Sequence, residues 1–260
     1  MADQGPLNVV PLAVILPDPN LDVVPLAVIL PGQNILPPNN VLPPDFDHIT
    51  NVCCIGATQS SVMHMAVIAE RYPRLNVVVA DFNQQLIEDW NEGNIDFEEE
   101  GMFELLENLA VANLQFVDDV NEAIVDAQMI FIGVEIPIKV IGCREGFDLR
   151  LWVKAIRRIV KVAPTSKIIV ERSTMPIDSF DMTTTLLARR PPPPYGQPAV
   201  QFAVMSNPDF YSPGSRLQDL RNPDRVVIGL KSNVGDVLPL QQLYMVFNSK
   251  PRSNPRSPSA

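Results

Sequence analysis

The sequence predicts an α/β protein with a mostly parallel sheet covered by helices on both faces. Short apolar runs alternate with longer amphipathic stretches over most of the chain, which is typical of repeated strand–helix units. The runs are continuously apolar, as expected for strands that are buried on both faces. The segment 149–163 shows helical spacing most clearly, with Ile156 and Ile159 on its apolar side.

Each expected strand is a short apolar run, and the expected helices are the longer stretches that lie between these runs. Strands are expected at 51–55, 76–80, 114–117, 128–134, 167–171, 201–205 and 225–229. Helices are expected at 61–72, 84–92, 102–109, 119–126, 149–163, 175–189 and 235–247. The proline-rich segment 190–196 is expected to be a loop that ends a helix.

The two ends of the chain differ in composition from the middle. The nonapeptide Val9–Pro17 recurs unchanged at Val23–Pro31. Proline removes amide donors and favours extended chain, so we expect 1–47 to be a disordered, low-complexity extension. The alternative is a strand that binds a proline-recognition module or the protein's own sheet edge. The tail 249–260 is polar and basic, and we expect it to be disordered. The folded domain is therefore predicted at 48–248.

Charge and cysteine content exclude several classes of protein. The formal net charge of −10 argues against nucleic acid as a partner. Cys53 and Cys54 are adjacent on an expected strand, so they face opposite sides and cannot pair easily, which indicates core positions in a reducing compartment. The cysteines and histidines lack the spacing of a metal site. The apolar runs are too short to span a bilayer and no secretory signal is visible, so we expect a cytoplasmic protein without a membrane partner.

The most informative segment is the turn that follows the first expected strand. That strand ends in Gly56, and 25 residues later a second apolar strand ends in Asp81. A glycine turn before a helix, followed by an acid at the end of the next strand, is the layout of a Rossmann dinucleotide-binding unit. The fingerprint has the form G-x-G-x-x-G, whereas this chain offers Gly56, Thr58 and Ser61. We therefore predict a Rossmann-like, doubly wound sheet with an altered phosphate loop.

Two interpretations of this turn stay open. Thr58 adds a β-branched side chain where the backbone should approach a diphosphate, although the helix N-terminus still offers amides and a dipole. The turn, including Ala57, either holds a diphosphate or only joins strand to helix. Asp81 either binds the ribose hydroxyls or caps the next helix.

From about residue 51 to residue 248 the chain resembles the NAD-binding domain of the UDP-glucose dehydrogenases. Gly56 and Asp81 occupy the two ends of the nucleotide-binding pattern, and Ile169–Pro176 is similar to the family's Lys-Ser-Thr-Val-Pro turn. The most specific segments are Met205–Phe210 and Asp219–Gly229. The order and spacing of these segments match the family across the domain.

The resemblance implies NAD as cofactor, UDP-glucose as substrate and oxidation to UDP-glucuronate in two NAD-dependent steps through a nucleophilic cysteine. Thr174 would help to hold the catalytic water, and Asp209 stands where the family has its acid–base glutamate. The same Ser173–Thr174 pair could cap the helix that follows it. The residues implied at the cofactor are Gly56, Ala57, Thr58, Ser61, Asp81, Val134, Pro137, Ser173 and Thr174.

The resemblance places the nucleophilic cysteine, the oxyanion-stabilising lysine and asparagine, and the domain that closes over the UDP-sugar beyond Ala260. We therefore expect a truncated NAD-binding domain with weak or no turnover of its own. The alternatives are a non-catalytic regulatory homologue that associates with a full-length dehydrogenase subunit, and a decayed gene fragment.

Overall fold

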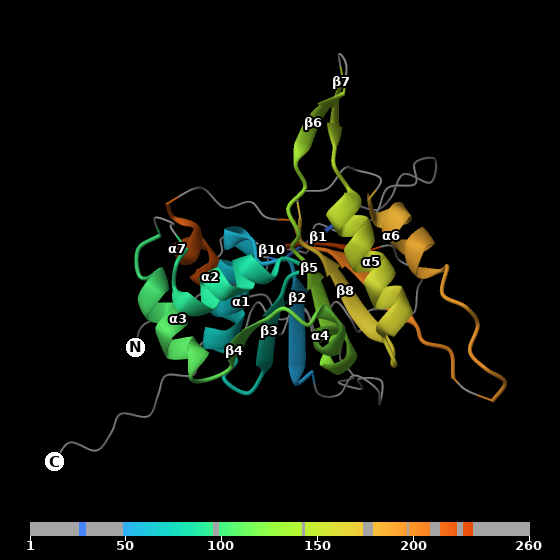
Figure 1. The fold of residues 1–260 in the computed structure, drawn as a ribbon, viewed down its shortest axis with the longest axis horizontal. Helices are drawn as coiled ribbons and strands as arrows, with labels where there is room; N and C mark the ends of the chain where they lie inside the picture. Colours follow the sequence, from blue (N-terminus) through green and yellow to red (C-terminus); the bar gives the residue numbers. More distant parts are fainter. Residues whose placement is uncertain are drawn as a thin grey trace, which may run out of the picture.

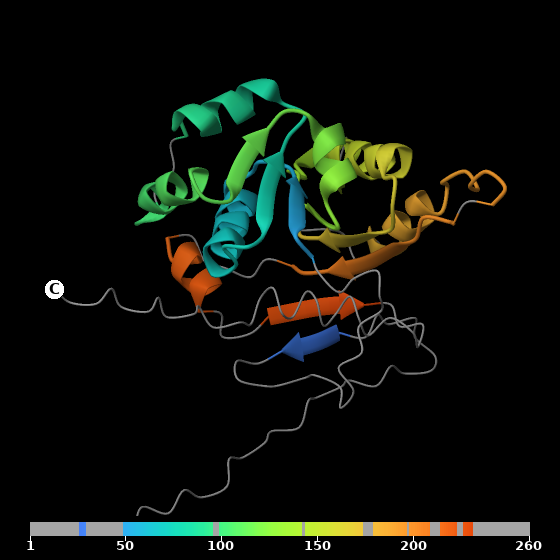
Figure 2. The ribbon, with the colours of Figure 1, turned by 90° about the horizontal axis from the view of Figure 1, so that it is seen from below.

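The protein is built on one large sheet. The structure is a computed structural model, and it describes residues 26–29, 49–95, 99–141, 144–173, 179–196, 198–208, 214–222 and 226–230. Six strands run parallel: β2 (Asn51–Ile55), β3 (Asn76–Ala80), β4 (Leu114–Val117), β5 (Met129–Ile132), β8 (Lys167–Glu171) and β9 (Phe202–Ser206). Two antiparallel strands, β10 (Val226–Leu230) and β1 (Leu26–Ile29), extend the sheet beyond β9 (Figures 1 and 2).

The strand order identifies where a ligand would bind. The sheet runs β1-β10-β9-β8-β5-β2-β3-β4. Counted from the β4 edge, the six parallel strands are the third, second, first, fourth, fifth and sixth along the chain. This is the order of a doubly wound Rossmann sheet, and it confirms the predicted fold class. The direction of winding reverses between β2 and β5, and ligands of such sheets bind at the carboxyl ends of the strands at that point.

Helices cover both faces of the sheet (Figure 1). One hydrophobic cluster contains residues of α1 (Gln59–Arg71), α2 (Gln84–Glu92), α3 (Met102–Ala110) and α7 (Arg216–Arg221). The opposite cluster contains residues of α4 (Val120–Asp126), α5 (Arg150–Val162) and α6 (Ser179–Leu187). Because side chains alternate along a strand, each central strand contributes to both clusters.

The adjacent cysteines of β2 illustrate this alternation. Cys54 belongs to the first cluster and Cys53 to the second, with 0% and 1% of their surface exposed, and both thiols are free. Burial raises the pKa of Cys54 to about 12 and raises that of Cys53 as well. Both are therefore unreactive core residues, as their positions in the sequence predicted. Cys143 lies outside the described residues.

A two-stranded hairpin was not predicted. It consists of β6 (Ile138–Ile141) and β7 (Arg144–Phe147) and projects from the body of the molecule beyond the end of β5 (Figure 1). Its base is held by Asp148, which accepts hydrogen bonds from Arg150 and pairs with Lys139 at 2.6 Å. These partners hold the pKa of Asp148 well below its usual range. Ile138 and Phe147 are exposed, so the hairpin lacks the buried apolar pattern on which the prediction relied.

The N-terminal repeat contributes an ordered element. Leu26–Ile29 lies in the second copy of the nonapeptide and pairs with Val226–Gly229 of β10. These four residues therefore lie on the protein's own sheet edge, which is one of the two alternatives for the repeat. A run rich in β-branched residues between two prolines suits a short edge strand. The predicted helix 235–247 and the tail 249–260 lie outside the described residues.

None of the helices that the structure describes has both the length and the apolar character needed to cross a bilayer.

Candidate dinucleotide site

The turn after β2 requires glycine at residue 56. Gly56 has a φ of +113°, which side-chain-bearing residues rarely adopt, and its amide donates to the Ala80 carbonyl at 2.8 Å. A Cβ atom at this position would lie 2.5 Å from the carbonyl carbon of Gly133 and from the amide nitrogen of Val134. The turn therefore passes directly against the end of β5, as a dinucleotide loop does.

The acid at the end of β3 holds this turn in place. The Asp81 carboxylate accepts hydrogen bonds from the Ala57 amide at 2.8 Å and from the Asn83 amide at 2.9 Å. Trp90 of α2 donates its indole N–H to the Ala57 carbonyl at 2.9 Å. The structure thus brings Gly56, Ala57 and Asp81 together, and half-buried Asp81 lies at the edge where a ribose would be expected.

Thr58 and Ser61 cap α1 with their own hydroxyl groups. Thr58 Oγ1 accepts a hydrogen bond from the Ser61 amide at 3.2 Å and donates to Ser61 Oγ at 2.8 Å. Ser61 Oγ donates in turn to the Gly133 carbonyl at 2.8 Å. The Ser61 amide is one of the helix N-terminal donors that a phosphate would use. Here that donor is already occupied by Thr58, the residue at the second glycine position.

The carboxyl ends of β5 and β8 form the other wall of the site. A cavity of about 200 Å³ lies between the turn and these strand ends and is lined by residues that include Thr58, Ser61, Val134 and Ser173. Ser173 donates its hydroxyl to the Val134 carbonyl at 2.7 Å. The adjoining Glu135 side chain is exposed to solvent.

The remaining predicted site residues are more distant or not described. Half-buried Pro137 lies at the foot of the hairpin, where its carbonyl accepts a hydrogen bond from the Asp148 amide at 2.8 Å. Thr174 and Asp209 lie outside the described residues.

Two buried charged residues at the end of β8 were not among the predicted site residues, and one of them, Arg172, lines the cavity. Arg172 is 3% exposed and donates to the Asn207 side-chain oxygen at 2.8 Å. Glu171 is 2% exposed and accepts hydrogen bonds from the hydroxyls of Ser179 and Thr183 on α6. The available sequence signal was an acidic residue followed by a basic one at the end of an apolar strand. This signal does not reveal that both side chains are buried.

Glu171 should make the stability of the protein depend on pH. Burial raises its pKa, so the folded state holds a proton more tightly than the unfolded state does. The free energy of unfolding should therefore fall as the pH rises from 4.5, the value for an exposed glutamate, towards the raised value in the fold. We expect Glu171→Gln to stabilise the fold at pH 7 by on the order of 1 kcal/mol. Urea denaturation at pH 4, 5.5 and 7 measures this.

The control for this prediction is Glu88→Gln, which alters an exposed glutamate on α2. It should leave the pH profile unchanged. At pH 4 the native Glu171 is itself protonated, so the gain in stability from Glu171→Gln should disappear there. A gain that is equally large at pH 4 and pH 7 would show that the buried carboxylate charge is not its cause.

The reversal of strand order, the glycine turn and the acid at the end of β3 together define a dinucleotide-binding domain of the Rossmann type. Residues 50–248 match the family model described as the NAD-binding domain of the UDP-glucose/GDP-mannose dehydrogenase family. The chain belongs to this family. Its model is that of an NAD-binding domain, so NAD is the cofactor that the resemblance assigns.

Relatives of known sequence and structure agree with this assignment. The chain is 33% identical over 201 residues to UDP-glucose 6-dehydrogenase 1 of Arabidopsis thaliana and to UDP-glucose 6-dehydrogenase 5 of Oryza sativa subsp. japonica. It resembles the structure of a UDP-glucose dehydrogenase from the hyperthermophilic archaeon Pyrobaculum islandicum, with a TM-score of 0.65 and 27% identity, over 80% of this chain and 46% of that one. The matches to the two plant proteins cover 76% of this chain but only 40% and 41% of their lengths.

Proposed function

We propose that this domain binds NAD weakly at the carboxyl ends of β2, β3 and β5, and that it serves UDP-glucose oxidation only as the cofactor-binding part. The observation that carries the proposal is the contact between Asp81 and the Ala57 amide, which joins the acid to the glycine turn at 2.8 Å. This contact supports the proposal, because the acid at the end of the second strand binds the adenosine ribose in Rossmann domains. The 33% identity to plant UDP-glucose 6-dehydrogenases supports UDP-glucose as the substrate class.

The residues of the site fit one half of the cofactor better than the other. Asp81 would hold the ribose hydroxyls of the adenosine at the edge of the sheet where its carboxylate accepts the Ala57 amide of the glycine turn. At the diphosphate, a ligand must displace the Thr58 hydroxyl to reach the Ser61 amide. Exposed Glu135 adds a negative charge beside an anionic cofactor. The fit therefore favours weak binding.

When bound, NAD supplies the hydride acceptor of an alcohol oxidation. The chain's own contribution would be to orient the cofactor through Asp81. The hydrogen bond from Ser173 to the Val134 carbonyl would hold together the wall of the site at the ends of β5 and β8. The covalent step of the family requires a reactive thiol. The described cysteines cannot supply one, because Cys53 and Cys54 are buried and burial raises the pKa of each.

The first experiment is an NAD⁺ titration of the full chain by calorimetry. We expect a dissociation constant on the order of 1 mM, since one helix amide is already capped. Thr58→Gly should bind NAD⁺ roughly tenfold more tightly, because it frees the Ser61 amide at little cost to the helix cap. Asp81→Asn should weaken binding by roughly tenfold, because it removes the charged acceptor while an oxygen can still accept from Ala57.

The matched control is Glu107→Gln, which removes the same charge from an exposed position on α3 and should leave NAD⁺ affinity unchanged. Absence of heat and of thermal shift at millimolar NAD⁺ would overturn the proposal and favour a role through association with another dehydrogenase subunit. Formation of NADH from UDP-glucose by the purified chain, abolished in Thr174→Ala, would contradict the claim that the domain only binds cofactor.

A further inference from the structure

The loop between α6 and β9 carries a feature that cofactor binding does not use. It contains four consecutive prolines, Pro191–Pro194, followed by Tyr195 and Gly196, and all six residues are exposed. The Tyr195 side chain is as open as in an extended peptide, with a relative exposure of 108%. Figures 1 and 2 show this loop, in orange, reaching away from the body of the molecule.

Proline chemistry restricts the shape of this segment. Each proline holds its own φ near −65°, and each residue that precedes a proline is pushed towards the extended region. Both restrictions act on Pro191, Pro192 and Pro193, so the segment favours the polyproline II helix. That helix has three residues per turn, which places Pro192 and Tyr195 along the same edge.

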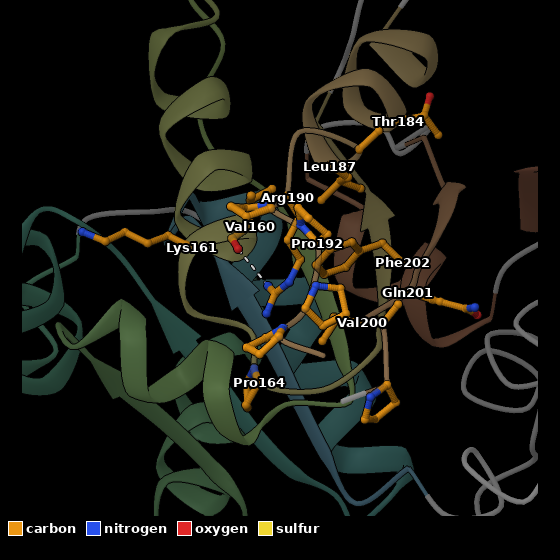
Figure 3. Close-up of a pocket in the computed structure, with 16 residues that line it drawn as sticks. Val160, Lys161, Pro164, Thr184, Leu187, Arg190, Pro192, Val200, Gln201 and Phe202 are labelled. Carbon is orange, nitrogen blue, oxygen red and sulfur yellow. Dashed lines mark hydrogen bonds between the residues drawn. The ribbon is translucent and has the colours of Figure 1, made fainter. Parts of the chain in front are cut away.

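The loop is anchored at its two ends, while residues 191–196 in its middle are exposed to solvent. Arg190 donates a hydrogen bond to the Val160 carbonyl at the end of α5, at 2.8 Å (Figure 3). At the far end the Gln201 amide donates to the Ser166 hydroxyl at 3.0 Å. Between these anchors the prolines line a cavity of about 1080 Å³ together with Phe202 and the ends of α5 and α6. A partner can therefore approach the loop from its outer side.

We propose that Pro192–Tyr195 is a docking segment for a WW-type proline-recognition domain of a partner protein. Such a domain holds a polyproline II segment in an aromatic-lined groove, and the sequence Pro-Pro-x-Tyr offers paired prolines followed by an aromatic anchor. Because the prolines pre-order the segment, binding costs little conformational entropy.

The charge beside the segment adds a property of the partner. Exposed Arg189 and Lys161 lie next to the loop together with Arg190, although the whole chain carries a net charge of −10. A partner groove with an acidic rim would complement this local positive charge. Binding should therefore weaken as the salt concentration rises. This inference is independent of the NAD site, which lies at the opposite ends of the strands.

The test is calorimetric titration of the full chain with a recombinant WW domain that binds Pro-Pro-x-Tyr peptides. We expect a dissociation constant on the order of tens of micromolar. Tyr195→Ala should weaken binding by roughly tenfold or more, and it should not lower the melting temperature because the ring is fully exposed. Pro198→Ala alters an exposed proline of the same loop outside the segment and should leave affinity unchanged.

Three results would overturn the proposal. The first is binding of the WW domain to a synthetic peptide of residues 190–196 but not to the full chain, because the fold would then withhold the segment. The second is equal binding of the native chain and Tyr195→Ala. The third is tighter binding of an SH3 domain, which would assign recognition to the Pro191–Pro194 spacing without the tyrosine.

Discussion

Replacing Gly56 by alanine is expected to abolish stable folding of the domain. The φ of +113° is unfavourable for alanine, and the added Cβ would lie 2.5 Å from two backbone atoms of Gly133 and Val134. Backbone atoms at the end of a buried central strand cannot move aside as a flexible side chain can. We expect a loss of more than about 4 kcal/mol in the free energy of unfolding, which is close to the whole stability of many domains.

Gly93→Ala provides the matched control. Gly93 also has a positive φ, +73°, but a Cβ there meets no atom within 4 Å. Its substitution should cost about 1 kcal/mol, the conformational preference alone. Urea denaturation followed by circular dichroism and tryptophan fluorescence compares the two variants. Equal stabilities of Gly56→Ala and Gly93→Ala would mean that the turn can shift away from β5, and the close approach would then not be needed for folding.

The layers of the fold were predictable because strands that are buried on both faces are apolar at nearly every position. All six parallel strands were expected within about one residue of their bounds, apart from β5, which is shorter than predicted. The direction of β10 was not predictable in the same way. An apolar run such as 226–230 reads alike in both directions, and its antiparallel pairing depends on the connection that leads to it. Helix α7 has only six residues and is too short to show a helical period.

The site was predictable to the extent that it is local. Gly56 and Asp81 were expected at one edge because each follows a parallel strand, and the structure links them through the Ala57 amide. The contact that joins the phosphate loop to β5 is not local in the sequence. Ser61 and Gly133 are 72 residues apart, and only the order of β2 beside β5 brings them together. A single sequence offers no periodicity from which such a pair could be read.

The pair formed by Ser61 and Gly133 leads to the second large effect. A Cβ on residue 133 would lie 2.0 Å from Ser61 Oγ, 2.9 Å from Ser61 Cβ and 3.1 Å from Cys54 Sγ. Gly133→Ala should therefore destabilise the fold by about 3 kcal/mol, as overpacking of a closed core does. Ser61→Gly removes the first two obstacles, so it should restore part of the stability when combined with Gly133→Ala. A coupling energy of about 1–2 kcal/mol is expected from the double-mutant cycle by urea denaturation.

Combining Gly133→Ala with Cys54→Ala distinguishes relief of a specific collision from general loosening. The sulfur is the most distant of the three neighbours, and its removal leaves a cavity, so this pair should show no rescue.

In the dinucleotide fingerprint, the third glycine allows the first helix to pack closely on the sheet. Here Ser61 stands at that position, and the facing strand supplies the space through Gly133. If the effects of Ser61→Gly and Gly133→Ala were simply additive, helix α1 would have to tolerate displacement from β5, and the altered phosphate loop would owe nothing to this complementarity. A positive coupling would instead mean that the missing glycine of the loop is compensated across the interface between α1 and β5.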